Sequence, residues 1–341
     1  MIQEQDSHKF VLVLHPFERF RPIALSNPVS SSHPVTYPRA HLVDPVNGGF
    51  YHCCSRCVRR AWLCGEDPLT GRSFEHRKAW IETRILQLCE IFAIDLYAYA
   101  VMSNHYHIVV DVVPKRTQEW SDEEVSERFC KLHPGHSPQK TELQFTSLLN
   151  DPEKLADTRK MLGSLSKFMS RLNQPIAWQA NREDGVTGHF WEQRFKSTAL
   201  LNEEAILSAM AYVDLNPVRA KIVERAKEAR HTSFAHRTSP TETHHKSPLA
   251  NLDRLGITSA GYADIVEWTA SVARGGVKSP DSETTRALSK LGYSPDRWLG
   301  RVRVHRFNYR AYGAFSLLRE YTERLGQQWL RGAKPGLAAP P

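Results

Sequence analysis

The sequence predicts an α+β fold: a ferredoxin-like antiparallel sheet with helices on one face, followed by a mainly helical C-terminal extension. Residues 50–56, 96–102 and 105–113 are rich in the β-branched and aromatic residues typical of strands. Residues 73–94 repeat apolar side chains at helical spacing. The resulting order of strand, helix, strand, strand is the start of a ferredoxin-like unit, in which helices cover an antiparallel sheet.

Composition limits the class of protein before any motif is considered. The chain has 341 residues, enough for one large or two modest domains, and a formal net charge of +8 with a pI near 9.2. That charge favours a polyanionic partner. We see no apolar run long enough for a membrane span, no signal peptide and no Walker-type glycine loop. We therefore expect a cytoplasmic protein with reduced cysteines, no membrane association and no nucleotide cofactor.

The hairpin expected at residues 96–113 places two histidines together. Ser103 and Asn104 form the expected two-residue turn, and His105 and His107 follow it. Side chains two residues apart on a strand point to the same face, so both imidazoles project together. This geometry suits a divalent cation or a reacting phosphate. The structural alternative is a half-exposed strand that carries two polar residues.

Residues 200–222 predict a helix that presents a tyrosine and an amide on one flank. Asn202 is a favourable N-cap and is followed by two glutamates in the first turn. Pro217 marks the expected end of the helix. Tyr212 and Asn216 are four residues apart and therefore point the same way. The structural alternative is a tyrosine at the rim of the core followed by a capping Asn-Pro pair.

Three short motifs occur in a fixed order along the chain. They are Ser-Asn-His-Tyr-His at 103–107, Trp-Glu-Gln-Arg-Phe at 191–195 and Tyr-Val-Asp-Leu-Asn-Pro-Val-Arg-Ala at 212–220. Together they resemble the REP-associated tyrosine transposases, one-tyrosine members of the HUH (His-hydrophobe-His) group of single-strand DNA transposases. The resemblance covers roughly residues 40–225. Tyr106 departs from the usual aliphatic residue between the histidines, but it should face the other side of the strand.

The resemblance implies an HUH nuclease core that cleaves and rejoins single-stranded DNA at REP-like hairpins through a covalent 5′-phosphotyrosine intermediate. It implies that Tyr212 is the nucleophile and that His105, His107 and Asn216 hold Mg²⁺ or Mn²⁺. The opening strand of the family carries a similar His and Arg, which match His52 and Arg56; a solvated basic loop is the alternative for Arg56. The basic residues expected at the DNA are Arg56, Arg194, Lys196 and Arg219. We expect a monomer or a weak homodimer.

Two other classes of function fit parts of the pattern. A catalytically inactive DNA- or RNA-binding relative of the same fold would be expected to lack a histidine or the tyrosine, and this chain has all three. A two-histidine phosphoesterase needs a second His-x-Thr/Ser motif. Residues 231–233 and 236–238 are candidates, although they lie in a polar stretch. That enzyme would hydrolyse its substrate without a covalent link to the protein.

Shifts in composition divide the chain into five regions. We predict a loosely ordered arm at 1–38, a nuclease domain at 39–230 with a helical insertion at 114–190, a linker at 231–250, a helical basic accessory region at 251–334 and a disordered tail at 335–341. Within the insertion, residues 121–132 and 151–173 each predict a helix. Residues 298–334 hold eight Arg or Lys against two Glu, 8 − 2 = +6, with aromatics interleaved. They predict either a DNA contact or amphipathic helices with buried aromatics.

Overall fold

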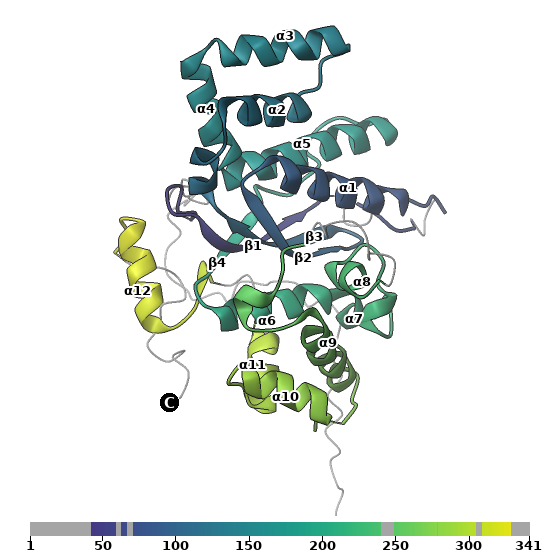
Figure 1. Ribbon diagram of the computed structural model, residues 1–341. Coiled ribbons are helices and arrows are strands. Elements are labelled where there is room, and N and C mark those ends of the chain that lie inside the picture. The colour runs from purple at the N-terminus through teal and green to yellow at the C-terminus, as the bar shows by residue number, and fades with distance from the viewer. Residues whose placement is uncertain are drawn as a thin grey trace, which may run out of the picture. The chain divides into compact units, whose positions relative to one another are not determined.

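The computed structural model describes residues 42–58, 63–66, 71–239, 249–277, 279–304 and 309–328 (Figure 1). The predicted N-terminal arm and C-terminal tail lie outside these residues. At the centre is a five-stranded sheet of order β2-β3-β1-β4-β5. The strands are β1 (Gly49–Arg56), β2 (Ile94–Val101), β3 (His105–Val112), β4 (Lys196–Leu200) and β5 (Ala311–Tyr312).

The first four strands pair antiparallel, and β5 pairs parallel to β4. Their order along the sheet is the ferredoxin-like one, in which the first strand lies between the third and the fourth. The predicted hairpin is present, with residues 103 and 104 between β2 and β3. The α+β class and the mostly antiparallel sheet are confirmed.

Helices cover both faces of the sheet, whereas we predicted them on one. Helices α1 (His76–Ile91) and α5 (Leu165–Glu183) pack on one face, and α6 (Glu203–Asp214) packs on the other (Figure 1). The reason is that the strands are apolar on both sides. In β3, Ile108 and Val110 point toward α1 and α5, while Val109 points toward α6. A sheet that is buried on both faces needs two layers of helix.

The second helix of the ferredoxin-like unit is therefore α5, and not the helix that carries Tyr212. Helix α5 lies within residues 114–190, which we interpreted as an insertion, but it packs directly against α1 and the sheet. The rest of that region forms η2 (Pro114–Gln118), α2 (Asp122–Leu132), α3 (Pro138–Leu149) and α4 (Pro152–Leu162). The helix predicted at 121–132 is confirmed as α2.

The single helix predicted at 151–173 is wrong, because the chain breaks between α4 and α5. The break falls at Gly163, where a Cβ atom would lie 3.1 Å from the Cα of Pro114. Ser164 then caps α5, with its side chain accepting a hydrogen bond from the backbone N–H of Lys167. The close approach to Pro114 favours a residue without a Cβ atom at this position. The apolar spacing runs on through the break, so the sequence pattern did not reveal it.

The C-terminal extension is mainly helical, as predicted. After α6 come α7 (Asn216–Arg219), η3 (Ala226–Glu228), α8 (Ser233–Thr238), η4 (Asp253–Leu255), α9 (Ser259–Ala273), α10 (Ser282–Lys290), α11 (Pro295–Val304) and α12 (Phe315–Arg324). Helix α8 lies in the stretch that we predicted as a linker, and Phe234 within it is buried. The boundaries of the five predicted regions stay predictions.

Part of the basic C-terminal region is used in packing, while residues 305–308 and 329–334 of it lie outside the described residues. Trp298 and Tyr321 are buried, and Arg297 and Arg301 form ion pairs with Glu204 of α6. For these residues the structure favours the amphipathic-helix alternative over a DNA contact. Within the part of the chain that the structure describes, no helix has the length and apolar character to cross a membrane.

Candidate active site

A small pocket of about 120 Å³ lies where β1, β3, β4 and α6 come together. It collects six of the eight residues that we predicted at the site: Arg56, His105, His107, Arg194, Lys196 and Tyr212. Cys54, Glu192 and Gln193 complete its lining. Strand pairing explains the convergence. Cys54 of β1 lies opposite His107 of β3 on one side and opposite Lys196 of β4 on the other.

The two histidines project from β3 into the pocket as the alternation of a strand requires. Their ring centroids are 4.8 Å apart. Tyr106 points to the other face, where its hydroxyl donates to Oδ1 of Asn173 on α5 at 2.6 Å. The expectation that Tyr106 faces away from the site is thus confirmed. Its size is accommodated in the core between the sheet and α5.

Each histidine has its Nδ1 beside another side chain. Nδ1 of His107 is 3.0 Å from Nε2 of His52, and Nδ1 of His105 is 2.6 Å from Oδ1 of Asn104. A proton on each Nδ1 would leave Nε2 as the nitrogen that can ligate a cation. Burial, reinforced by the charge of Arg56, lowers the pKa of His105 to about 3. A neutral imidazole is the form that binds metals.

The donor set fits a cation only in part. Among the described residues, no group of three or more His, Cys, Asp or Glu side chains is arranged to hold a metal. The histidine pair would therefore supply two protein ligands, and oxygen atoms from elsewhere would have to complete the shell. Such a mixed set is compatible with Mn²⁺ and tolerable for Mg²⁺.

Tyr212 reaches the pocket from the last turn of α6. The helix starts where predicted, with Asn202 as the N-cap accepting from the backbone N–H of Ala205 at 3.0 Å. The Tyr212 ring lies edge-on to His107 and His52, with centroid distances of 5.8 and 5.9 Å. Its phenol group is therefore grouped with the imidazoles, as the proposed chemistry requires.

Asn216 and Arg219 do not line the pocket. The side-chain amide of Asn216 donates to the backbone carbonyl of Tyr212 at 3.3 Å, at the junction of α6 and α7. The guanidinium of Arg219 lies over the Tyr212 ring, 4.9 Å from its centroid. Both residues lie beyond the end of α6, in the short helix α7 that contains Pro217.

Two residues at or beside the pocket, Glu192 in its lining and His52 behind His107, were not assigned a site role from the sequence. His52 is buried and touches His107, although we had expected it only near DNA. Glu192 is the carboxylate in the pocket, and it lies inside the motif at 191–195. His52, Cys54 and Arg56 alternate along one strand and therefore share a face, and this pattern could have placed His52 near the site. The motif itself gave no reason to choose Glu192 over its neighbours.

The pocket is electropositive and holds no reactive thiolate. Arg56, Arg194 and Lys196 face a single carboxylate, that of Glu192. Burial raises the pKa of the Cys54 thiol to about 12, so it stays protonated at neutral pH and is a poor nucleophile. A phosphate group in this pocket would lie among cationic side chains and the Tyr212 phenol.

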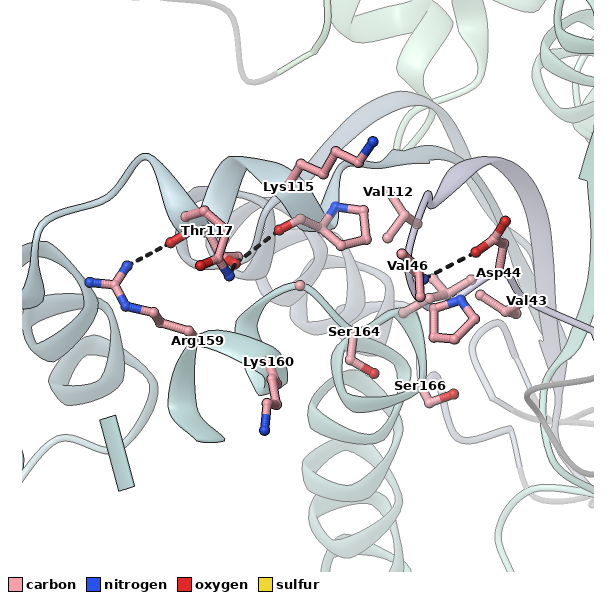
Figure 2. Close-up of a pocket in the computed structure, with 15 residues that line it drawn as sticks. Val43, Asp44, Val46, Val112, Lys115, Thr117, Arg159, Lys160, Ser164 and Ser166 are labelled. Carbon is pink, nitrogen blue, oxygen red and sulfur yellow. Dashed lines mark hydrogen bonds between the residues drawn. The ribbon is translucent and has the colours of Figure 1, made fainter. Parts of the chain in front are cut away.

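A larger pocket of about 490 Å³ lies at the other end of β3 (Figure 2). None of the predicted site residues lines it. Two of its charged groups are engaged in structural hydrogen bonds: Arg159 donates to the carbonyls of Thr117 and Trp120, and Asp44 accepts from the backbone of Val46. The pocket contains no paired imidazoles and no candidate nucleophile beside them, so the smaller pocket is the better candidate for chemistry.

The second motif needed by a two-histidine phosphoesterase lies elsewhere. Nδ1 of His231 is 2.5 Å from Oε2 of Glu82 on α1, and Nδ1 of His236 is 3.2 Å from the Tyr99 hydroxyl. Neither histidine lines the pocket of His105 and His107. Neither candidate for the second His-x-Thr/Ser motif of a two-histidine phosphoesterase therefore lies at this pocket.

Comparison with known proteins finds one distant structural neighbour. No family model matches the chain, and no curated protein matches it in sequence. A solved structure described as a REP-associated tyrosine transposase bound to a REP hairpin aligns over 60% of this chain and 87% of that one, with 12% identity and a TM-score of 0.31. A similarity this distant does not decide function, which has to be argued from the residues of the pocket.

Proposed function

We propose that the protein is a metal-dependent, HUH-type nuclease and transposase that cleaves and rejoins single-stranded DNA at hairpin elements. The observation that carries this proposal is the convergence of His105, His107 and Tyr212 in one basic pocket. The residues come from a strand and a helix that are far apart in the sequence. A core-packing role would not require two imidazoles, a phenol and three cations to share so small a space.

The reaction proposed for Tyr212 is a transesterification. Its phenol oxygen would form a bond to the scissile phosphorus as the bond to the 3′-oxygen breaks, which leaves a 5′-phosphotyrosine and a free 3′-hydroxyl. The phenol loses one proton and the departing oxygen gains one. Because one phosphoester bond replaces another, a 3′-hydroxyl can attack the intermediate and rejoin the strand without ATP.

The cationic side chains would bind the phosphate and stabilise its charge. Arg56 and Lys196 stand at the ends of neighbouring strands, and Arg194 precedes β4. Charge-assisted hydrogen bonds from such groups are strongest where the transition state carries most negative charge. Arg219, over the Tyr212 ring, would orient the phenol rather than contact the scissile phosphate.

His105 and His107 would hold Mg²⁺ or Mn²⁺ through their Nε2 atoms, and a cation there neutralises charge on the phosphate and on the leaving oxygen. Asn216 is proposed as a further ligand on the resemblance alone, since its amide nitrogen bonds the main chain of Tyr212. The proposed partners are single-stranded DNA hairpins, bound by a monomer or a weak homodimer.

The deciding experiment uses labelled single-stranded hairpin oligonucleotides from the flanks of the gene, with Mn²⁺ or Mg²⁺, on a denaturing gel. We expect a covalent protein–DNA band that is lost in Tyr212→Phe and in the presence of a chelator. Tyr293→Phe, at a half-buried tyrosine after α10, is the matched control and should keep the band. Cleavage without a band would indicate hydrolysis. Binding without cleavage would favour the inactive nucleic-acid-binding relative.

A further inference from the structure

Helix α5 carries an exposed tryptophan that core packing does not explain. The Trp178 side chain is 64% exposed, whereas Trp120, Trp268 and Trp298 are buried. The buried side of α5 is formed by Phe168, Leu172 and Ile176, among others. Trp178 lies on the solvent side of the same helix, where a polar residue would be the default.

Two arginines lie on the same side of α5 as Trp178. The guanidinium of Arg182, one turn further along, lies 5.4 Å from the Trp178 ring centroid. Arg171 precedes Trp178 by seven residues, close to two helical turns, and so projects in nearly the same direction. An exposed aromatic ring with cationic side chains on the same side of a helix is the kind of surface that binds a single-stranded nucleic acid, with a base on the ring and phosphates on the cations.

This surface lies at the end of the sheet that holds the candidate active site. Helix α5 starts near Pro114, just beyond the C-terminal end of β3. By Asn173 it has reached the start of β3, since Asn173 bonds Tyr106 and Ser55. Trp178 follows five residues later, about 7.5 Å further along the helix axis. It therefore stands beyond the strand end at which His105 projects.

Residues 185–191, which follow α5, connect this helix to the candidate active site. Asn181 donates to the carbonyl of Gly188 at 3.0 Å, and the Trp191 indole donates to the carbonyl of Asn173 at 2.9 Å. These bonds hold residues 185–191 against α5. The next residue, Glu192, already lines the pocket. The pocket and α5 lie on opposite faces of the sheet, so a DNA strand that leaves the pocket past Glu192 would reach α5 by crossing the end of the sheet along residues 185–191.

We propose that Trp178, Arg171 and Arg182 form a binding site for an unpaired stretch of single-stranded DNA next to the segment that is cleaved. A base stacks on the Trp178 indole, and the two arginines contact the flanking phosphates. The inference rests on the proposed function for the identity of the nucleic acid. Duplex DNA is not expected to bind here, because its bases are stacked on one another and offer no free face to the indole.

The test measures binding of single-stranded oligonucleotides, lengthened stepwise on either side of the cleaved position, in a Tyr212→Phe background that cannot form the covalent link. Trp178→Ala should weaken binding about tenfold, which corresponds to about 1.4 kcal/mol, within the range for one stacked base. The loss should appear only once the oligonucleotide is long enough on one side to reach α5. Trp178→Phe should retain part of the affinity, and Arg182→Gln should weaken binding less than Trp178→Ala.

Leu143→Ala is the matched control, because Leu143 on α3 is 69% exposed and equally unexplained by packing. Neither substitution should lower the thermal midpoint. Unchanged affinity in Trp178→Ala at every length, or an equal loss in Leu143→Ala, would overturn the proposal. The nuclease function and the Trp178 site can be contradicted independently of each other. Trp178-dependent binding without any covalent product would remove the nuclease function alone, whereas normal cleavage with no effect of Trp178→Ala on binding would remove this site alone.

Discussion

At the scale of single residues, His52 is the side chain whose role the structure adds. Its Nε2 atom lies against Nδ1 of His107, so it is placed to hold the ring and keep the proton on Nδ1. Outer partners of ligating histidines orient the ring, and their loss costs about 10–100-fold in metal affinity or activity. The role is one of positioning, because His52 does not line the pocket itself.

We predict that His52→Phe, which keeps a ring but removes the hydrogen bond, weakens Mn²⁺ binding by about 10–100-fold. Isothermal titration calorimetry of Mn²⁺ into the DNA-free protein measures this without reference to activity. His52→Gln, which retains a hydrogen-bonding group, should recover part of the affinity. His189→Phe, at an exposed position, is the control. Mn²⁺ binding that is unchanged in His52→Phe would contradict the positioning role.

Residue-scale reasoning from the sequence succeeded where the two-residue period of a strand was sufficient. It placed His105 and His107 together and Tyr106 on the opposite face. It did not give His52 a partner, because that depends on the register in which β1 pairs with β3, with Cys54 opposite His107. Register is set by contacts across the sheet, and a single strand does not contain that information.

At the scale of elements, α6 is tied to the C-terminal extension through Asp214. This buried carboxylate accepts hydrogen bonds from the Ser233 hydroxyl, from the backbone N–H of Phe234 at 3.1 Å and from the Tyr262 hydroxyl at 2.6 Å. Two segments, α8 and α9, thus meet at the helix that presents Tyr212. The stretch at 231–239 read as a linker because its composition is polar, but its polar side chains satisfy a buried acid.

Burial raises the pKa of Asp214 to about 6, despite the hydrogen bonds that oppose the shift. Between about pH 4 and pH 6 the folded protein therefore holds a proton that the unfolded chain has lost. The contribution of this group to the free energy of unfolding is full below about pH 4 and is lost as the pH rises to about 6. We expect a decrease of about 1–3 kcal/mol across that window.

Asp214→Asn should remove this part of the pH dependence, because an amide is neutral throughout and can still accept from Ser233 and Phe234. Urea denaturation of both proteins between pH 4 and pH 7 measures it. The informative quantity is the difference in slope between variant and parent, since other groups titrate in both. Parallel curves would show that the pKa of Asp214 is the same in the folded and the unfolded chain, which would contradict the raised pKa.

At the scale of the whole molecule, the sequence predicted the class of fold and the order of the first elements, but not which helix completes the unit. The uninterrupted apolar runs at 97–101 and 108–110 are typical of strands buried on both faces, but we interpreted these strands by their two-residue period alone and expected helices on one face. The break at Gly163 concealed α5 within a longer apolar pattern. As a result, α6 was assigned the place that α5 occupies.

The net charge of +8 belongs to the whole chain, and it raises the question whether DNA binding reflects that charge or the pocket. Binding to a single strand weakens with salt, and each phosphate contact contributes about 0.7 to the slope of log affinity against log salt. We predict that Lys196→Gln and Arg56→Gln each reduce the slope by about 0.7. Arg286→Gln on α10 removes the same charge at an exposed site away from the pocket lining and should leave the slope unchanged.

Fluorescence anisotropy with one labelled oligonucleotide at a series of salt concentrations, again in the Tyr212→Phe background, gives the slopes directly. If Arg286→Gln lowers the slope as much as Lys196→Gln, DNA affinity depends on the net charge of the molecule and not on the cations of the pocket. A slope that falls only for the pocket variants would mean that phosphates are bound at the ends of β1 and β4. Those strand ends hold the cations beside His105, His107 and Tyr212. The residues that bind phosphate would then lie in the same pocket as the residues proposed to cleave the DNA.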